Sequence, residues 1–193
     1  MAAQKEMIRI RLKAYDHQLI DQTFEEFEGR FDTVAYGAPL LASDEDIQMV
    51  AQALADEFPR EEGQLIALMG HGAPDGPNHL YVEIERALAD EGRDDVCIAL
   101  VEGTPDVEHV LDRARREKPS RALLAPLMIV AGDHANNDLA GDEDDSWKSL
   151  IEALGIPTRC RLAGLGEYPA IRSLFVEHAR TALSNARHKQ VES

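Results

Sequence analysis

The sequence predicts a parallel α/β sheet with helices on both faces. Short apolar runs of strand length alternate with longer segments whose apolar residues recur at helical spacing, which is typical of βαβ units. Three of the apolar runs end abruptly in glycine and polar residues, as strands do at the carboxyl edge of an open sheet. With 193 residues, 44% of them hydrophobic, the chain can form one sizeable domain with its own core.

The N-terminal part of the chain is predicted to hold two strands and two helices. Residues 7–15 alternate apolar and basic side chains, which predicts a half-exposed strand. A helix is expected from residue 16 to about residue 30, and a short strand at residues 33–36. A second helix is expected after Ser43, because Ser43 can cap it and Asp46 follows three residues later, as in a variant of the capping box.

The remaining elements alternate between strand and helix to the end of the chain. Strands are predicted at residues 64–69, 96–101, 122–130 and 159–162. Helices are predicted at residues 77–90, after Thr104 as N-cap, at residues 146–154 and at residues 170–185. Residues 187–193 are expected to form a disordered tail.

Polar residues follow three of the predicted strands at the point where each strand ends. His71 lies between two glycines after residues 64–69, Glu102 follows residues 96–101, and His134 follows residues 122–130. Because the carboxyl ends of parallel strands meet at one edge of a sheet, we expect these side chains to converge. Two imidazoles and a carboxylate form a plausible ligand set for a divalent transition metal. Each residue also has a structural interpretation, as a turn residue, a helix cap or a hydrogen-bonded pair.

Charge and composition exclude several classes of function. The chain has 20 Lys and Arg against 36 Asp and Glu, so its formal charge of −16 argues against nucleic acid and anionic membranes as partners. It has no apolar run long enough for a transmembrane helix, and its first residues do not resemble a signal peptide. Cys97 and Cys160 are expected to be free thiols, which favours the cytoplasm as the location.

The polar loops contain spaced motifs that together identify a family. They include Gly37-x-Pro39, Gly70-His71-Gly72, Glu102-Gly103, Gly132-Asp133-His134-Ala135-x-Asn137-Asp138, Asp145-Ser146-Trp147-Lys148 and Gly164-Leu165-Gly166-Glu167. Over residues 31–185 the sequence resembles the anaerobic sirohydrochlorin cobaltochelatases of cobalamin biosynthesis, which share the fold of the ferrochelatase superfamily. The run from Gly132 to Lys148 is the most specific of these matches.

The resemblance implies a lyase that inserts Co(II) into sirohydrochlorin or a related tetrapyrrole. The metal ligands of the family fall on His71, Glu102 and His134. His71 and His134 would also be the catalytic residues, with His71 favoured as the base, and Asp133 and Asn137 would orient the imidazoles. Co(II) is the substrate metal, and no organic cofactor is expected. Imidazole and carboxylate ligands alone do not select among Co(II), Ni(II) and Fe(II).

The segment before the resemblance departs from the family. Members carry a whole α/β half there, whereas residues 8–22 resemble the beginning of the tenth small-subunit ribosomal protein. We therefore expect a βα element at residues 1–30 and a chelatase-like domain at residues 31–186, acting as a homodimer. One alternative is a non-catalytic half-chelatase that binds metal or tetrapyrrole. Another is a protein that associates with RNA, which the acidic composition disfavours.

Overall fold

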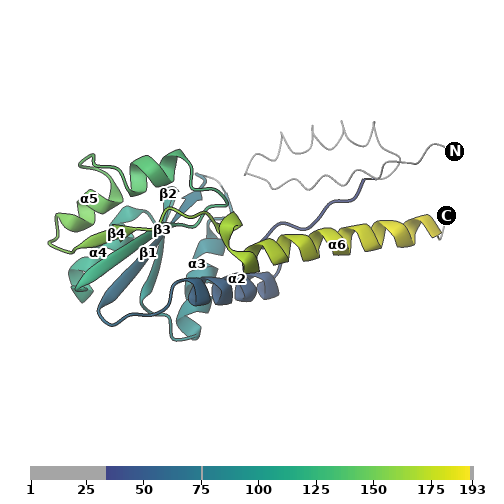
Figure 1. The fold of residues 1–193 in the computed structure, drawn as a ribbon, viewed down its shortest axis with the longest axis horizontal. Helices are drawn as coiled ribbons and strands as arrows, with labels where there is room; N and C mark the ends of the chain where they lie inside the picture. The colour runs from purple at the N-terminus through teal and green to yellow at the C-terminus, as the bar shows by residue number, and fades with distance from the viewer. Residues whose placement is uncertain (1–33, 75, 192–193) are drawn as a thin grey trace. The chain divides into compact units, whose positions relative to one another are not determined.

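The computed structural model describes residues 34–74 and 76–191, without the side chains of residues 187–191 (Figure 1). The predicted strand at residues 7–15 and helix at residues 16–30 lie outside the described residues. The chain divides into two compact units, residues 1–39 with 175–193, and residues 40–174. The second unit lies inside the predicted domain of residues 31–186, whose limits stay a prediction.

A parallel sheet forms the centre of the second unit. Within the described residues it has four strands in the order β2-β1-β3-β4, and every pairing between neighbours is parallel. The strands are β1 (Gln64–Gly72), β2 (Val96–Glu102), β3 (Arg121–Pro126) and β4 (Thr158–Cys160). The predicted fold class is therefore confirmed.

Helices cover both faces of this sheet. They are α2 (Asp44–Glu57), α3 (His79–Asp90), α4 (Val107–Glu117) and α5 (Trp147–Glu152). A further helix, α6 (Pro169–Val191), begins in this unit and continues into the other. Met69 shares a core with Leu111 of α4 and Trp147 of α5, whereas a methyl group on Gly70 would lie 2.4 Å from the ring of Tyr81 in α3. Because neighbouring residues of a strand point to opposite faces, α3 covers the face opposite α4 and α5.

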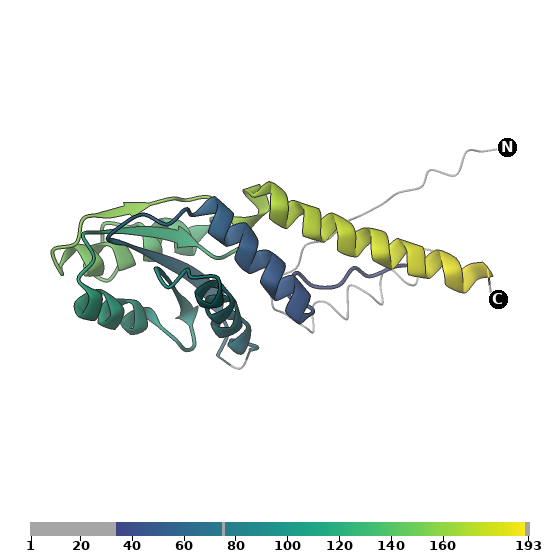
Figure 2. The same cartoon turned by 90° about the horizontal axis from the view of Figure 1, so that it is seen from below.

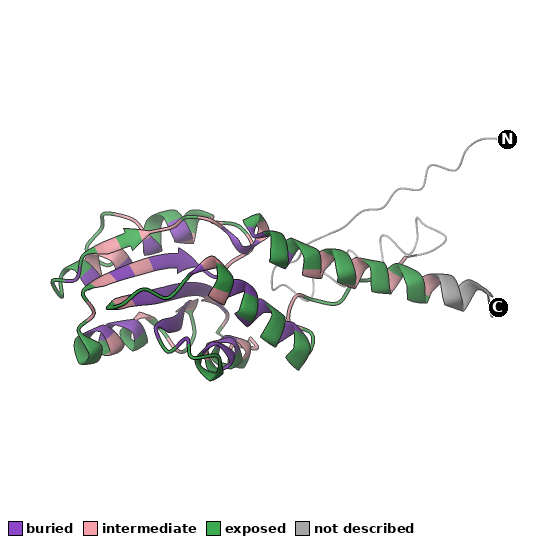
Figure 3. Ribbon diagram, turned by 60° about the horizontal axis from the view of Figure 1, so that its bottom comes forward, coloured by how far each residue is buried: buried purple, intermediate pink, exposed green. Residues whose placement is uncertain are grey.

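Burial follows this layered arrangement. The strands are mostly buried while the outer sides of the helices are exposed (Figure 3). Helix α2 lies beside α3 (Figure 2) and adds Val50 and Leu54 to the core. None of the helices in the described part of the chain has the length and apolar character needed to cross a membrane.

The start of α2 confirms the predicted cap. The backbone N–H of Asp46 donates to Ser43 Oγ at 3.2 Å, and the Asp46 carboxylate accepts a hydrogen bond from Ala42 N at 3.0 Å. In the usual capping box the carboxylate accepts from the cap residue itself. Here it reaches one residue further back, which makes the motif a variant of the box.

Two strand predictions differ from the structure. The strand predicted at residues 122–130 ends at Pro126, which cannot donate to a further ladder bond, and β4 pairs only with residues 122–124. Leu127 N still donates to Met69 O at 2.7 Å, after which the chain leaves the sheet. Residues 34–36, predicted as part of a strand, form no strand.

Two helix ends also differ from the prediction. Helix α4 is capped by Asp106 rather than Thr104, since the Asp106 side chain accepts from Glu108 N at 3.1 Å. Asp106 has the extended backbone of an N-cap residue, with φ −98° and ψ −171°, so the helix begins at Val107. Helix α6 continues beyond residue 185 to Val191, where the sequence predicted a tail from residue 187.

Candidate functional site

The two histidines lie where the order of the strands reverses. From β1 the chain passes through α3 to β2 on one side, then returns through α4 to β3 on the other side of β1. Open α/β sheets bind ligands outside the carboxyl ends of their strands at such a point. His71 lies at the carboxyl end of β1, and the loop that follows β3 leads to His134.

The structure brings His71 and His134 into contact. Their ring centroids are 4.8 Å apart and the ring planes meet at 85°, in an edge-to-face arrangement. His71 Nδ1 lies 3.0 Å from the carbonyl oxygen of Gly72, and His134 Nδ1 lies 2.5 Å from Asp138 Oδ2. Since a carbonyl or a carboxylate oxygen accepts, each Nδ1 donates. Each neutral imidazole then keeps the lone pair of its Nε2 for a metal ion or a proton.

A short π-helix holds the His134 end of the site. It spans η1 (Ala135–Leu139), and its first and last side chains are fully buried. The side chain of Asn136 donates from Nδ2 to Gly132 O at 2.8 Å, which ties the start of the turn to the preceding loop. Single π-turns occur frequently at functional sites, and the sequence pattern did not predict this one.

A second loop braces the chain between β3 and His134. Leu165 N donates to Met128 O at 2.8 Å, and Gly166 N donates to Ile129 O at 3.0 Å. A side chain at Gly164 would come within 2.5 Å of Ile129 O, so glycine is needed for this close approach. The two loops therefore hold each other in place beside the imidazoles.

Glu102 lies beside the histidines in the sheet without joining them. It is the last residue of β2 and pairs in register with Gly72, one residue beyond His71. Paired residues of a sheet point to the same side and neighbours along a strand to opposite sides, so the register groups Glu102 with Gly72 rather than His71. The ligand atoms of His71, Glu102 and His134 are accordingly not all within 4.8 Å of one another. The three-residue metal site stays a prediction.

The family model described as Cobalt chelatase (CbiK) matches residues 8–184. The chain belongs to this family. Because the match begins at residue 8, it includes residues 8–22, and the comparisons give no support to the resemblance of that segment to a ribosomal protein.

Two relatives carry the name of the predicted family. The chain is 40% identical over 157 residues to a sirohydrochlorin cobaltochelatase from Salmonella typhimurium. This match covers 81% of this chain and 59% of the relative. It is 32% identical over 156 residues to the sirohydrochlorin cobaltochelatase CbiKC from Nitratidesulfovibrio vulgaris. This match covers 80% of this chain and 55% of the relative. The chain thus matches less than two thirds of the length of either relative.

Two solved structures share the fold. SirB from Bacillus subtilis with Fe³⁺ superposes with a TM-score of 0.60 at 15% identity, covering 88% of this chain and 66% of SirB. A CbiX protein from Marinobacter aquaeolei VT8, described as a cobalamin (vitamin B12) biosynthesis protein, superposes with a TM-score of 0.51 at 20% identity. That match covers 65% of this chain and 98% of the CbiX protein. These likenesses confirm the predicted fold.

The carboxylate that contacts an imidazole is not one of the predicted pair. Asp133 and Asn137 were expected to orient the histidines, but among the described residues it is Asp138 that bonds to His134. The spacing from His134 to Asp138 is i, i+4, which places two side chains on one face of a helical turn. Recognising a helical turn after Gly132 would have identified Asp138 from the sequence.

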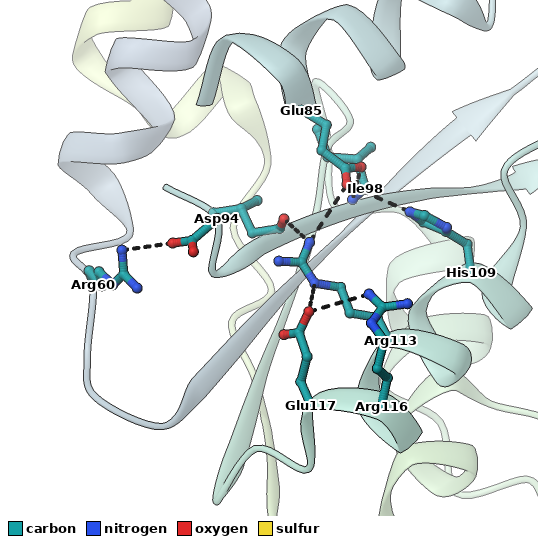
Figure 4. Close-up of polar contacts among 9 residues, drawn as sticks. Arg60, Glu85, Asp94, Ile98, His109, Arg113, Arg116 and Glu117 are labelled. Atoms are coloured by element: carbon teal, nitrogen blue, oxygen red, sulfur yellow. Dashed lines mark hydrogen bonds and ion pairs between the residues drawn. The ribbon is translucent and has the colours of Figure 1, made fainter. Parts of the chain in front are cut away.

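A second cluster of metal-binding residue types lies at the outer edge of β2, which among the described strands pairs with β1 alone. Among the described residues, Glu85, Cys97 and His109 have ligand atoms within 4.8 Å of one another. Glu85 Oε2 accepts from the backbone N–H of Ile98 at 2.8 Å (Figure 4). Arg113 donates from Nη1 to the carbonyl oxygen of Val96 at 2.6 Å. These side chains occupy backbone groups of an edge strand that would otherwise be open to a second chain.

The chemistry of Cys97 agrees with a structural role for this cluster. Burial, and then the charge of Glu85, raise the pKa of the Cys97 thiol to about 12. A metal ion binds the thiolate rather than the thiol. The guanidinium of Arg113, 3.7 Å from Glu85 Oε1, would also repel a cation. We therefore assign the cluster to protection of the sheet edge.

Proposed function

We propose that this chain inserts Co(II) into sirohydrochlorin, or a closely related tetrapyrrole, during cobalamin biosynthesis. Membership of the cobalt chelatase family and the names of the two relatives support the reaction. The observation that carries the proposal for the site is the contact between His71 and His134, with both Nδ1 atoms already bonded. Two imidazoles so arranged offer two nitrogen ligands at one edge of the sheet.

The reaction sets the roles of these residues. Insertion places Co(II) among four pyrrole nitrogens and releases two N–H protons. In the proposal Nε2 of His71, Nε2 of His134 and the Glu102 carboxylate hold Co(II). As the metal passes to the macrocycle the two imidazoles are freed, and each can accept one of the two protons, since the unperturbed pKa of an imidazole is about 6.5. Glu102 would join the imidazoles by turning its side chain around the end of β2. Val130, 71% exposed in the loop before His134, would provide apolar surface for the macrocycle.

The proposal also covers the oligomeric state of the protein and its cellular compartment. We propose a homodimer in which a second copy covers the site, because metal insertion requires the tetrapyrrole to be enclosed and the described imidazoles lie at one end of a single four-stranded sheet. Free thiols at Cys97 and Cys160 agree with a reducing compartment, so we propose the cytoplasm.

One assay tests the enzymatic proposal. Purified protein, sirohydrochlorin and Co(II) are mixed, and the change in tetrapyrrole absorbance is followed while sedimentation velocity measures the oligomeric state of the same sample. We expect insertion by a dimer, and its loss in His71→Ala and His134→Ala. His109→Ala is the matched control, because it removes an imidazole from the β2 edge and should keep the activity. An active monomer would contradict the dimer.

The same assay decides between insertion and binding alone. The matched stretch covers 59% and 55% of the two relatives, which keeps a non-catalytic protein that binds metal or tetrapyrrole as the alternative. That alternative predicts Co(II) affinity that depends on His71 and His134 without any increase in the rate of insertion. Repeating the assay with Ni(II) and Fe(II) identifies the preferred metal, since the ligand types suit all three.

A further inference from the structure

The two imidazoles differ in the group that accepts the hydrogen bond from Nδ1. The Nδ1 proton of His71 is held by a backbone carbonyl of β1, which the sheet itself keeps in place. The Nδ1 proton of His134 is held by a side chain, the carboxylate of Asp138, at 2.5 Å. The orientation of His134 therefore depends on a single side chain that a substitution can remove without touching the backbone.

Packing sets the position of Asp138 independently of His134. Asp138 lies in the π-helix between Ala135 and Leu139, both of which have no exposed surface. Gly141 N donates to Asn137 O at 3.0 Å and closes the turn. The carboxylate is thus presented by a turn anchored in the core, as an orienting group should be.

The exposure of the pair argues against a role in stability. The side chains of His134 and Asp138 are 39% and 48% exposed. Water competes for both groups at such exposure, and ion pairs of this kind contribute little to folding. An exposed imidazole with no fixed partner exchanges between its two tautomers, and only the tautomer with Nδ1–H presents Nε2 as a ligand.

We infer that Asp138 is a positioning residue for metal capture. Its carboxylate holds the Nδ1 proton of His134 and so keeps Nε2 of that ring available to Co(II) beside His71. The inference rests on the proposed function, since it takes His134 as a Co(II) ligand. Groups that orient a ligating histidine in this way typically change metal affinity by about 10–100-fold when removed.

The test compares Asp138→Ala and Asp138→Asn with the matched control Asp142→Ala. Asp142 is an exposed carboxylate nearby in the sequence that pairs with Lys148 at 2.9 Å, so its loss removes the same charge without touching an imidazole. Far-UV circular dichroism confirms that each variant folds. Calorimetric titration with CoCl₂ alone, without tetrapyrrole, measures the affinity, and ¹⁵N NMR of the imidazoles in the metal-free protein reports the His134 tautomer.

We expect Asp138→Ala to bind Co(II) about 10–100-fold more weakly than the wild type and to show His134 in both tautomers. Asp138→Asn keeps an accepting oxygen and should recover part of the affinity, while Asp142→Ala should match the wild type. Wild-type affinity in Asp138→Ala, or an unchanged tautomer, overturns the inference. Because the NMR measurement needs no turnover, a wild type that binds Co(II) at His134 but inserts none refutes the proposed enzyme and supports the inference.

Discussion

Replacing Gly72 with alanine should damage both the stability and the metal site. Gly72 has φ 74°, and a Cβ there would lie 1.9 Å from the carbonyl oxygen of Glu102 and 3.0 Å from Leu100 Cβ. The nearest of these atoms belongs to the backbone, so no change of rotamer relieves the clash. The ends of β1 and β2 would have to separate, which moves His71 away from Glu102.

The magnitude is the sum of two contributions. A side chain in the left-handed region costs about 1–2 kcal/mol. Overpacking adds roughly 1–3 kcal/mol when the neighbours cannot move aside. Gly72→Ala should therefore lower the free energy of unfolding by about 2–5 kcal/mol, which corresponds to a fall in Tm of roughly 2–4 °C per kcal/mol in a domain of this size.

Gly92→Ala separates these contributions. Gly92 has φ 78°, yet a Cβ there would meet no atom within 4 Å, so its replacement costs only the conformational contribution of about 1–2 kcal/mol. Urea unfolding followed by circular dichroism, with calorimetric titration of Co(II), measures both effects. Equal losses of stability in the two variants, or wild-type Co(II) affinity in Gly72→Ala, would refute the reasoning.

Three further predictions concern the core and its edges. Asp95→Ala should lower the free energy of unfolding by about 3–5 kcal/mol in urea titration, because the buried Arg93, which bonds to both Asp95 oxygens at 2.8 and 2.9 Å, loses the carboxylate that balances its charge. A loss below about 1 kcal/mol would contradict this. Asp106→Ala should cost about 0.5–2 kcal/mol in thermal unfolding through loss of the α4 cap, whereas Thr104→Ala should cost little; the reverse order would restore Thr104 as the cap. The pKa of Cys97 is raised from 9.0 to about 12 by burial, so between these pH values the unfolded chain loses a proton that the folded chain keeps, and stability should fall. Urea midpoints measured from pH 8 to 10.5 should decline less steeply in Cys97→Ala, and identical slopes would exclude this origin.

Much of the fold could be predicted from the sequence because element type is encoded locally. The apolar runs at β1 and β2 were found to within a few residues, since burial on both faces leaves no polar position inside a strand. The runs at β1 and β3 also predicted that His71 and His134 follow buried strands, although β3 ends at Pro126 and a loop separates it from His134. The contact between these two rings follows from the parallel order of the strands.

Only the tertiary structure determines the features that depend on pairing between distant segments, such as the register of the strands. The register of β1 with β2 groups Glu102 with Gly72 instead of His71, and no local pattern encodes that register. The loop after β3 is likewise held by a distant segment, since Met128 and Ile129 accept hydrogen bonds from the backbone N–H groups of Leu165 and Gly166. Periodicity along the chain reports which residues are buried, whereas the alignment of one strand with another is set by the packing of segments far apart in the sequence.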